Sequence, residues 1–467
     1  MITNLPSNMS PVVALNHIPR PARKAVVSAL AILLSVFSGG AQQPLSLQES
    51  VQYALQNSPL IQKAVLETRQ GDFQIKEYLS TGYPQLSGNA GFTYNIELPT
   101  QLIPNFFQGK PDELVPIQFG TALNASAGLE LNQMIYNHSF WLGMKGAQKL
   151  ADFNRLLEGK TREEVAYNVV KIYYQAQILA RQRDILLANI DQVDGLLRAT
   201  ELQFENGFVK KLDVDQLRVN RSSLQIQLQN LDLQMEQSLR ALKFAMAMPM
   251  DTPIALTDTL SDIQLPSPPA GGLSPEYANK IDIAILDQQQ ELLKLQYAQT
   301  KAEYIPSARL FANYSVQGQG NDFEQLGDGN QWFDYALVGV NIQIPIFDGL
   351  RKSHRLQQDN IELLQNEKDR QQTMNNLEFQ YTSAIQQLTS SWNTLVSIQE
   401  NRALAEQVYD ITQKRYREGL ASITEVLAAE TTMRQVQGNF LGALLQYKWA
   451  GLDLEYANGR LLQFINQ

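Results

Sequence analysis

The sequence contains no cysteine and only three histidines among its 467 residues. Without cysteine the chain has no disulfides, no thiolate metal site and no cysteine-borne lipid anchor. His138 and His354 are the only histidines beyond the first 48 residues, and two separated histidines do not predict a metal site. The complete phosphate-loop pattern and a recognisable nucleophile setting are also absent. These absences predict a protein that is not an enzyme and that holds no cofactor or metal.

Acidic residues are missing from the first 48 positions, and three basic residues directly precede an apolar run from Ala25 to Phe37. This layout predicts an export signal peptide over residues 1–41, cleaved before Gln42. The apolar run is too short to span a bilayer, and no apolar run of eighteen or more residues follows it. The sequence therefore predicts an exported protein without a membrane-spanning helix in its mature part.

Positive charge is in deficit, with 38 lysines and arginines against 47 acidic residues and a net charge of −9. A nucleic-acid partner is not expected from this balance, because such partners select for clustered positive charge. Ordinary apolar content with many glutamines is typical of long amphipathic helices.

The chain is duplicated. Residues 207–247 align with 419–459 at a constant offset that places Gly207 on Gly419, and an upstream segment at 128–137 parallels 339–348. A repeat of about two hundred residues is too long for a solenoid unit and indicates two fused copies of one module. We expect the copies at 42–264 and 273–467, joined by a Pro- and Gly-rich linker at 265–272.

Four stretches alternate between apolar and polar residues, at about 84–98, 119–135, 307–317 and 335–346. Each is ten or more residues long, which is the length that a tilted strand needs to cross a bilayer. A half-buried soluble sheet would show the same alternation, so this alternative stays open. If the strands lie in lipid, four cannot close a barrel, and the sheet must close with other copies of the chain. The segments 99–116 and 318–331 are expected as long external loops.

Helical spacing fills most of the remaining chain. Residues 137–206 contain no proline, and about seventy residues at 1.5 Å each would make a rod near 100 Å long. A shorter arm at 212–247 returns along it, and the segment 46–80, interrupted at Ser58-Pro59, is expected to extend that arm end to end. The second copy repeats these parts at 274–304, 350–418 and 422–457.

The turns between the paired helices lie at Phe204–Val214 and Tyr416–Leu427. In each, a glycine ends the first helix and an acidic residue opens the second, as helix caps require. Capping alone would account for Gly207, Gly419, Asp213 and Glu425 without any function.

The pattern Tyr-x-x-Gly-x-x-(Ser/Thr)-Ile-x-(Asp/Glu)-Val-Leu at Tyr416–Leu427, the duplicated strand-strand-helix-helix order and the export signal occur together. In these features the whole mature chain resembles the outer-membrane efflux protein family, the TolC-like exit ducts. The resemblance implies a mainly α protein with a membrane β-barrel: a homotrimer whose twelve strands form an outer-membrane barrel on a long periplasmic α-helical tunnel. It also implies a periplasmic adaptor protein and an inner-membrane pump of the RND or ABC type as partners, and outer-membrane lipid around the barrel.

The resemblance assigns roles at the helical tips. Asp213 and Tyr416 match positions that hydrogen bond to each other and hold the tunnel closed, and Glu425 matches an acid that rings the constriction. Two positions depart from the family pattern, since Ala421 and Ala428 replace a basic and an acidic residue. The expected adaptor contacts are small and apolar residues beside the turns, unless the larger ones fold back onto their own hairpin: Gly207, Phe208, Val209, Gly419, Leu420 and Ala421.

We therefore expect a passive outer-membrane exit duct of a tripartite efflux or type I secretion system, energised by the inner-membrane pump through the adaptor. A secreted structural or adhesive coiled-coil protein is one alternative, and a self-contained porin is another. The sequence contains no identifiable substrate pocket and does not name the transported solute.

Overall fold

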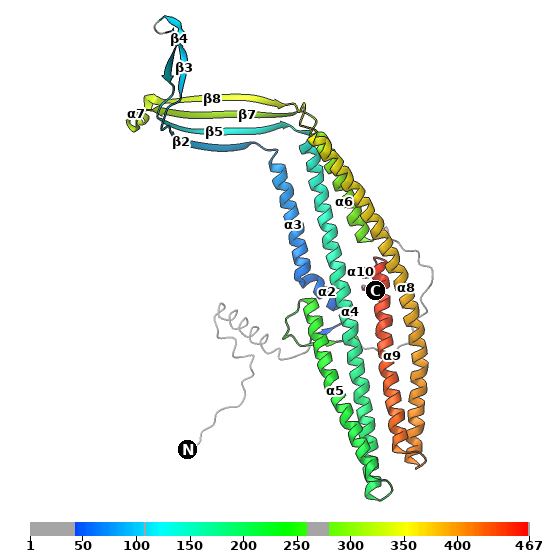
Figure 1. The fold of residues 1–467 in the computed structure, drawn as a ribbon. Helices are drawn as coiled ribbons and strands as arrows, with labels where there is room; N and C mark the ends of the chain where they lie inside the picture. The colour runs from blue at the N-terminus through cyan, green and yellow to red at the C-terminus, as the bar shows by residue number, and fades with distance from the viewer. Residues whose placement is uncertain (1–42, 107–108, 259–279, 466–467) are drawn as a thin grey trace, which may run out of the picture.

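The computed structural model describes residues 43–106, 109–258 and 280–465. The expected signal peptide at 1–41 and the expected linker at 265–272 lie outside these residues. The described part consists of an elongated bundle of helices with a four-stranded sheet at one end (Figure 1). In this part of the chain, no helix is both long and apolar enough to cross a membrane.

Two long helices run through the bundle, α4 (His138–Glu205) and α8 (Arg351–Arg417). They contain 68 and 67 residues, so each is about 100 Å long at 1.5 Å per residue. At the end far from the sheet they turn into α5 (Lys211–Met246) and α9 (Ile423–Ala457). The helices therefore form two antiparallel hairpins, as the duplicated sequence predicts.

Two shorter helices continue the return arms towards the sheet. Figure 1 shows α3 (Pro59–Ser80) in line with α5, and α6 (Ile281–Ala302) in line with α9. The end-to-end extension expected for residues 46–80 is thus present, and the second copy repeats it. The interruption at Ser58-Pro59 is also present: α2 (Leu47–Asn57) ends there, and proline occupies the first turn of α3, where its missing N–H removes no helical hydrogen bond.

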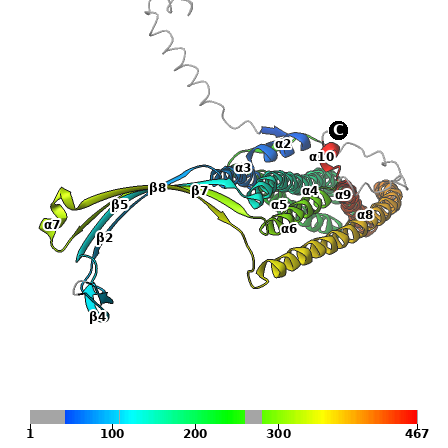
Figure 2. The same cartoon turned by 90° about the horizontal axis from the view of Figure 1, so that it is seen from above.

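The helices stand side by side in a row. Both α3 and α5 pack against α4, which in turn packs against α6 and α9, and α8 packs against α6 and α9. Seen from above, α3 lies near one end of the row and α8 at the other (Figure 2). Within the described residues, α3/α5 and α8 each have neighbouring helices on only one side of the row.

The four-stranded sheet is antiparallel and has the order β2-β5-β7-β8. Its strands β2 (Gln85–Tyr94), β5 (Leu123–Tyr136), β7 (Ser307–Gly320) and β8 (Trp332–Gln343) overlap the four alternating stretches. The two copies of the module meet where β5 pairs with β7. Strands β2 and β8 are left as the edges of the sheet.

The register separates an apolar face from a more polar one. On one face the pairing aligns Leu86, Leu131, Ala312 and Val338 across the four strands. The adjacent row on the opposite face is Ser87, Glu130, Asn313 and Leu337. Large residues of the apolar face are exposed, including Leu86, Leu129, Val338, Val340 and Ile342. The described chain therefore leaves uncovered most of a face that a soluble sheet would bury.

The two segments expected as loops contain regular structure. In the first, β3 (Thr100–Asn105) and β4 (Lys110–Gln118) pair antiparallel, and they stand apart from the larger sheet (Figure 1). Their prolines suggested a loop, but each strand of a two-stranded ribbon has a free edge on which proline removes no bond. The second segment contains the short helix α7 (Phe323–Gly327) and a 3₁₀ turn at Gly329–Gln331.

A small collar of short elements packs against one side of α4 near its middle. The parallel pair β1 (Gln43–Leu45) and β6 (Ile254–Leu256) packs there with α2 and α10 (Leu461–Ile465) in one apolar core. The Asp258 carboxylate joins these parts, since it accepts from the Leu47 backbone N–H at 2.8 Å and from the Tyr173 hydroxyl at 2.9 Å. Strands of three residues give no alternation signal, so the sequence did not predict this collar.

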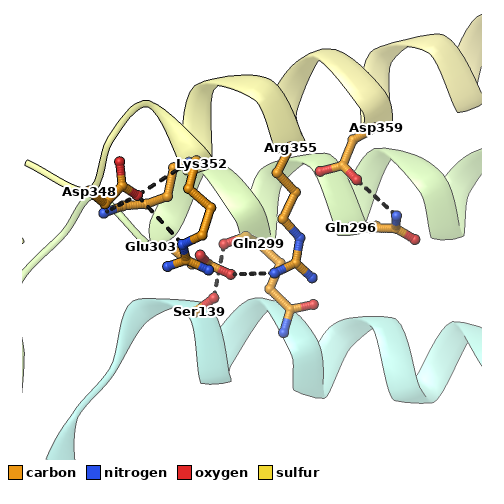
Figure 3. A network of polar contacts seen from close by, with 9 residues as sticks. Ser139, Gln296, Gln299, Glu303, Asp348, Lys352, Arg355 and Asp359 are labelled. Atoms are coloured by element: carbon orange, nitrogen blue, oxygen red, sulfur yellow. Dashed lines mark hydrogen bonds and ion pairs between the residues drawn. The ribbon is translucent and has the colours of Figure 1, made fainter.

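Polar contacts fix the helices where they meet the sheet (Figure 3). The chain enters α8 through Gly349 and Leu350, both with positive φ. Asp348 then accepts from the buried Lys352 ammonium at 3.0 Å, and this bond lowers the pKa of the Asp348 carboxyl. Glu303 pairs with Arg355 at 3.4 Å. These contacts tie α8 to the turn that follows β8 and to the end of α6.

Candidate functional site: the helical tips and the layer above them

The first tip is closed by a glycine cap. Gly207 has φ +79°, a conformation that other residues adopt only with strain. The Phe208 N–H donates to the Gln203 carbonyl at 2.9 Å, which satisfies a carbonyl at the end of α4. At the start of α5, Asp213 accepts from the Lys210 backbone N–H at 3.2 Å.

The second tip repeats this geometry. Gly419 has φ +75°, and the Leu420 N–H donates to the Arg415 carbonyl at 2.8 Å. Ser422 and Glu425 form a reciprocal capping box, with side-chain to backbone distances of 3.3 Å in both directions. The structure thus confirms that capping accounts for Gly207, Gly419, Asp213 and Glu425 as structural residues, whatever else they do.

Apolar side chains project from both turns. Phe208 is 81% exposed and Leu420 is 64% exposed, so neither folds back onto its own hairpin. Val209 and Ala421 beside them are half-buried. The chain therefore presents one uncovered apolar side chain at each tip.

Tyr416 is buried where the two hairpins meet, and its hydroxyl lies 3.4 Å from the Thr200 hydroxyl. Burial raises the pKa of Tyr416, and the negative charge of Asp213 raises it further. Asp213 is thus close enough to act on Tyr416 electrostatically, while its hydrogen bond goes to the Lys210 backbone. The sequence analysis did not predict a role for Thr200. Its position seven residues after Val193, on the buried side of α4, could have indicated that it is buried.

Glu425 and Ala428 are both exposed and line one groove between α8 and α9, of about 580 Å³. The same groove is lined by the exposed apolar residues Leu404 and Val408 on α8. With alanine at position 428, Glu425 is the only acid among the residues that line this groove.

Glu430 on α9 is buried between the hairpins. Its carboxylate pairs with Arg434 at 3.0 Å, and Arg434 also donates to Gln227 on α5 at 2.8 Å. A polar cavity of about 400 Å³ lies beside this contact, lined by residues of α4, α5 and α9. Apolar periodicity gives no warning of a buried acid, so the sequence did not predict this layer.

The described residues contain no group of three His, Asp or Glu side chains that could hold a metal ion. What they offer is a pair of long hairpins joined by polar contacts near their tips, attached to a sheet with an exposed apolar face.

A family model for the outer membrane efflux proteins matches residues 50–247 and 274–460. These two matches cover most of the chain, one in each copy of the module. The chain belongs to the outer membrane efflux protein family. The members of this family are outer-membrane channels and not enzymes. The resemblance suggested by the tip pattern and the duplication is thereby confirmed.

Relatives in the efflux protein family are distant in sequence but similar in length. The outer membrane protein TolC of Escherichia coli strain K12 is 23% identical over 463 residues, covering 94% of this chain and 87% of that protein. TolC of Salmonella enteritidis is 21% identical over 459 residues, with the same coverage of 94% and 87%.

Solved structures of channels share the fold. The Campylobacter jejuni CmeC outer membrane channel superposes with a TM-score of 0.68 at 18% identity, covering 89% of this chain and 86% of that one. The outer membrane protein VceC of Vibrio cholerae gives 0.65 at 17% identity, covering 88% and 96%. The fold of this efflux-family chain is therefore TolC-like over nearly its whole length.

Proposed function

We propose that this protein is the outer-membrane exit duct of an efflux or type I secretion system, and that it acts as a homotrimer. Three four-stranded sheets close into a twelve-stranded barrel in the outer membrane. The rows of helices form a tunnel in the periplasm, and solute passes through both. The observation that carries the proposal is the antiparallel sheet. Its long strands expose an apolar face, and its outer strands β2 and β8 are unpaired on one side.

The sheet supports a barrel made by several copies. In lipid, each unpaired backbone group at an edge costs several kcal/mol, so β2 and β8 must find partners. Four strands are too few to close on themselves. Pairing β2 of one copy with β8 of the next satisfies both edges, and the apolar face then turns outward to lipid.

The helices support the same ring of copies. On α5 an exposed stripe repeats every seven residues and consists of Leu212, Val219, Ile226 and Leu233, which are 54–67% exposed. It is distinct from the seam of Leu217, Leu224 and Leu231, which is buried. At the other end of the row, α8 exposes Leu404, Val408 and Ile411. Joining α5 of one copy to α8 of the next would cover both stripes.

The tips support a partner and a gate. Phe208 and Leu420 with their neighbours offer an apolar surface to the hairpins of a periplasmic adaptor, which links the duct to an inner-membrane pump of the RND or ABC type. Tyr416 and Thr200 hold the two hairpins of one chain together in the closed tunnel, Asp213 acts on Tyr416 through its charge, and Glu425 faces the constriction. The pump supplies the energy and most of the selectivity.

The two alternatives explain less of the structure. A secreted adhesive coiled-coil protein would have no use for long strands with an exposed apolar face. A self-contained porin would have no use for two hairpins about 100 Å long.

Two measurements test the proposal. Mass in detergent solution together with negative-stain images should show a trimer with a rod about 100 Å long below a wider head. Planar bilayers should show channels from the same preparation. A monomer that is soluble without detergent would overturn the duct.

A further inference from the structure

A buried ion pair lies on α9, above the tip contact of Tyr416. Glu430 is 2% exposed, and its partner Arg434, one turn further along, has 24% of its side chain exposed. Their atoms Oε1 and Nε are 3.0 Å apart. Apolar clusters flank the pair along α9, with Val426 and Met433 in one and Phe440 and Leu441 in the next.

Both partners reach the other hairpin. The Arg434 Nη1 donates to the Gln227 Oε1 at 2.8 Å, and the Asn220 Nδ2 donates to the Glu430 Oε2 at 3.4 Å. Asn220 and Gln227 are seven residues apart on α5, so they share one side of that helix. The contact therefore joins the hairpin α4/α5 to the hairpin α8/α9.

The polar contacts continue through the remaining helices. The Asn189 Nδ2 on α4 donates to the Gln437 Oε1 on α9 at 3.1 Å. The Gln437 Nε2 donates in turn to the Glu406 Oε1 on α8 at 3.4 Å. We name this layer the polar rung, and it consists of Asn189, Asn220, Gln227, Glu406, Glu430, Arg434 and Gln437.

A buried ion pair adds little net stability, because desolvation of the two charges offsets their attraction. Removing one partner is much more costly, because it leaves an unpaired charge away from water. That cost applies only while the hairpins are packed together. If they separate, water reaches the Glu430 carboxylate and the missing cation no longer matters.

We propose that the polar rung is a second closing contact of the tunnel, and that Arg434 is the residue that positions α9 against α5 within it. The rung acts independently of the contact between Tyr416 and Thr200 at the tips. The inference rests on the proposed function in one respect, since it takes duct opening to separate the two hairpins.

The test is planar-bilayer recording of the full-length protein isolated from membranes. Arg434→Met leaves Glu430 buried and unpaired, so the ratio of open to closed time should rise on the order of tenfold. The double variant Glu430→Met/Arg434→Met replaces the pair by an apolar contact, so this ratio should stay at or below that of the unaltered protein. A general loss of packing would move both variants in the same direction.

Two further variants keep the test sharp. Arg240→Met removes the cation of an exposed pair with Glu236 on α5, one turn apart at 2.6 Å, and should leave opening unchanged. Gln227→Leu removes the acceptor on the other hairpin while keeping the ion pair, and should raise opening by a smaller factor than Arg434→Met. Thermal midpoints of all variants show which of them fold.

The outcomes separate the two proposals. If the unaltered protein forms no channels, the proposed duct itself fails. If it conducts and Arg434→Met opens no more often, the rung is not a closing contact. Equal opening by the single and the double variant also overturns the inference. If Arg434→Met fails to fold, Gln227→Leu decides, because unchanged opening there contradicts the rung.

Discussion

At the tips, the contact between the two hairpins includes one pair of hydroxyl groups. The Tyr416 and Thr200 hydroxyls are 3.4 Å apart between the hairpins, and one such bond contributes about 0.5–1.5 kcal/mol. We predict that Tyr416→Phe and Thr200→Val each raise single-channel opening by a similar factor of about two to ten, and that the double variant adds little. Additive effects would show that the two hydroxyls act separately. An effect of Tyr416→Phe alone, matched by Asp213→Ala, would instead favour the pairing of Tyr416 with Asp213.

Tyr409 should make the protein sensitive to alkali. Burial raises its pKa to about 12, and the charges of Glu430 and Asp410 act in the same direction. In the unfolded chain a tyrosine ionises near pH 10, so the stabilisation from the neutral phenol is complete below about pH 10 and is lost as the pH rises towards 12. We predict a fall of the thermal midpoint over this range that is smaller in Tyr409→Phe, measured by circular dichroism. Parallel pH curves for the two proteins would contradict the assignment.

Helix caps stabilise the ends of the helices. The capping box of Ser422 and Glu425 opens α9, and loss of such a cap costs about 0.5–2 kcal/mol. We predict that Ser422→Ala lowers the free energy of unfolding by about 1 kcal/mol, measured by denaturant titration in detergent. Ser223→Ala, an exposed serine inside α5, is the matched control and should change it by less. Equal losses of unfolding free energy in both variants would show that the capping box does not stabilise α9.

The elements that the sequence predicted are the long ones, in which the helical or strand period repeats many times. Helices of about seventy residues repeat their apolar seam many times, and strands of ten or more residues alternate long enough to recognise. The hairpin β3/β4, the three-residue strands β1 and β6 and the turn α7 are too short or too rich in proline for such a signal. At the tips, the glycines and acids could be predicted because a helix cap is set by neighbouring residues. The roles of Thr200 and Glu430 could not, because they depend on which side of a helix packs against the other hairpin.

The shape of the whole molecule supports the proposed ring of copies. A curved row of helices has two unfinished ends, and the sheet above it has two unfinished edges on the same chain (Figure 2). In the proposed homotrimer the copies join head to tail, because one end of the row differs from the other, and a head-to-tail arrangement either closes into a ring or grows without limit. A defined particle therefore requires that the angle between copies close the ring, which three copies do if twelve strands make the barrel.

The stripe on α5 tests this ring at a single position. Ile226 lies in the middle of the stripe and is 55% exposed, so in an isolated chain a charge there would meet only water. In the ring it would be buried against α8 of the next copy, where an unpaired carboxylate costs several kcal/mol. We predict that Ile226→Glu reduces the trimer to monomers in detergent, measured by light scattering after size exclusion. Gln225→Glu adds the same charge at an exposed position of α5 that lies about 100° around the helix from Ile226, and it should leave the trimer intact. If both variants stay trimeric, α5 does not face the next copy, and the sheet edges alone must hold the ring.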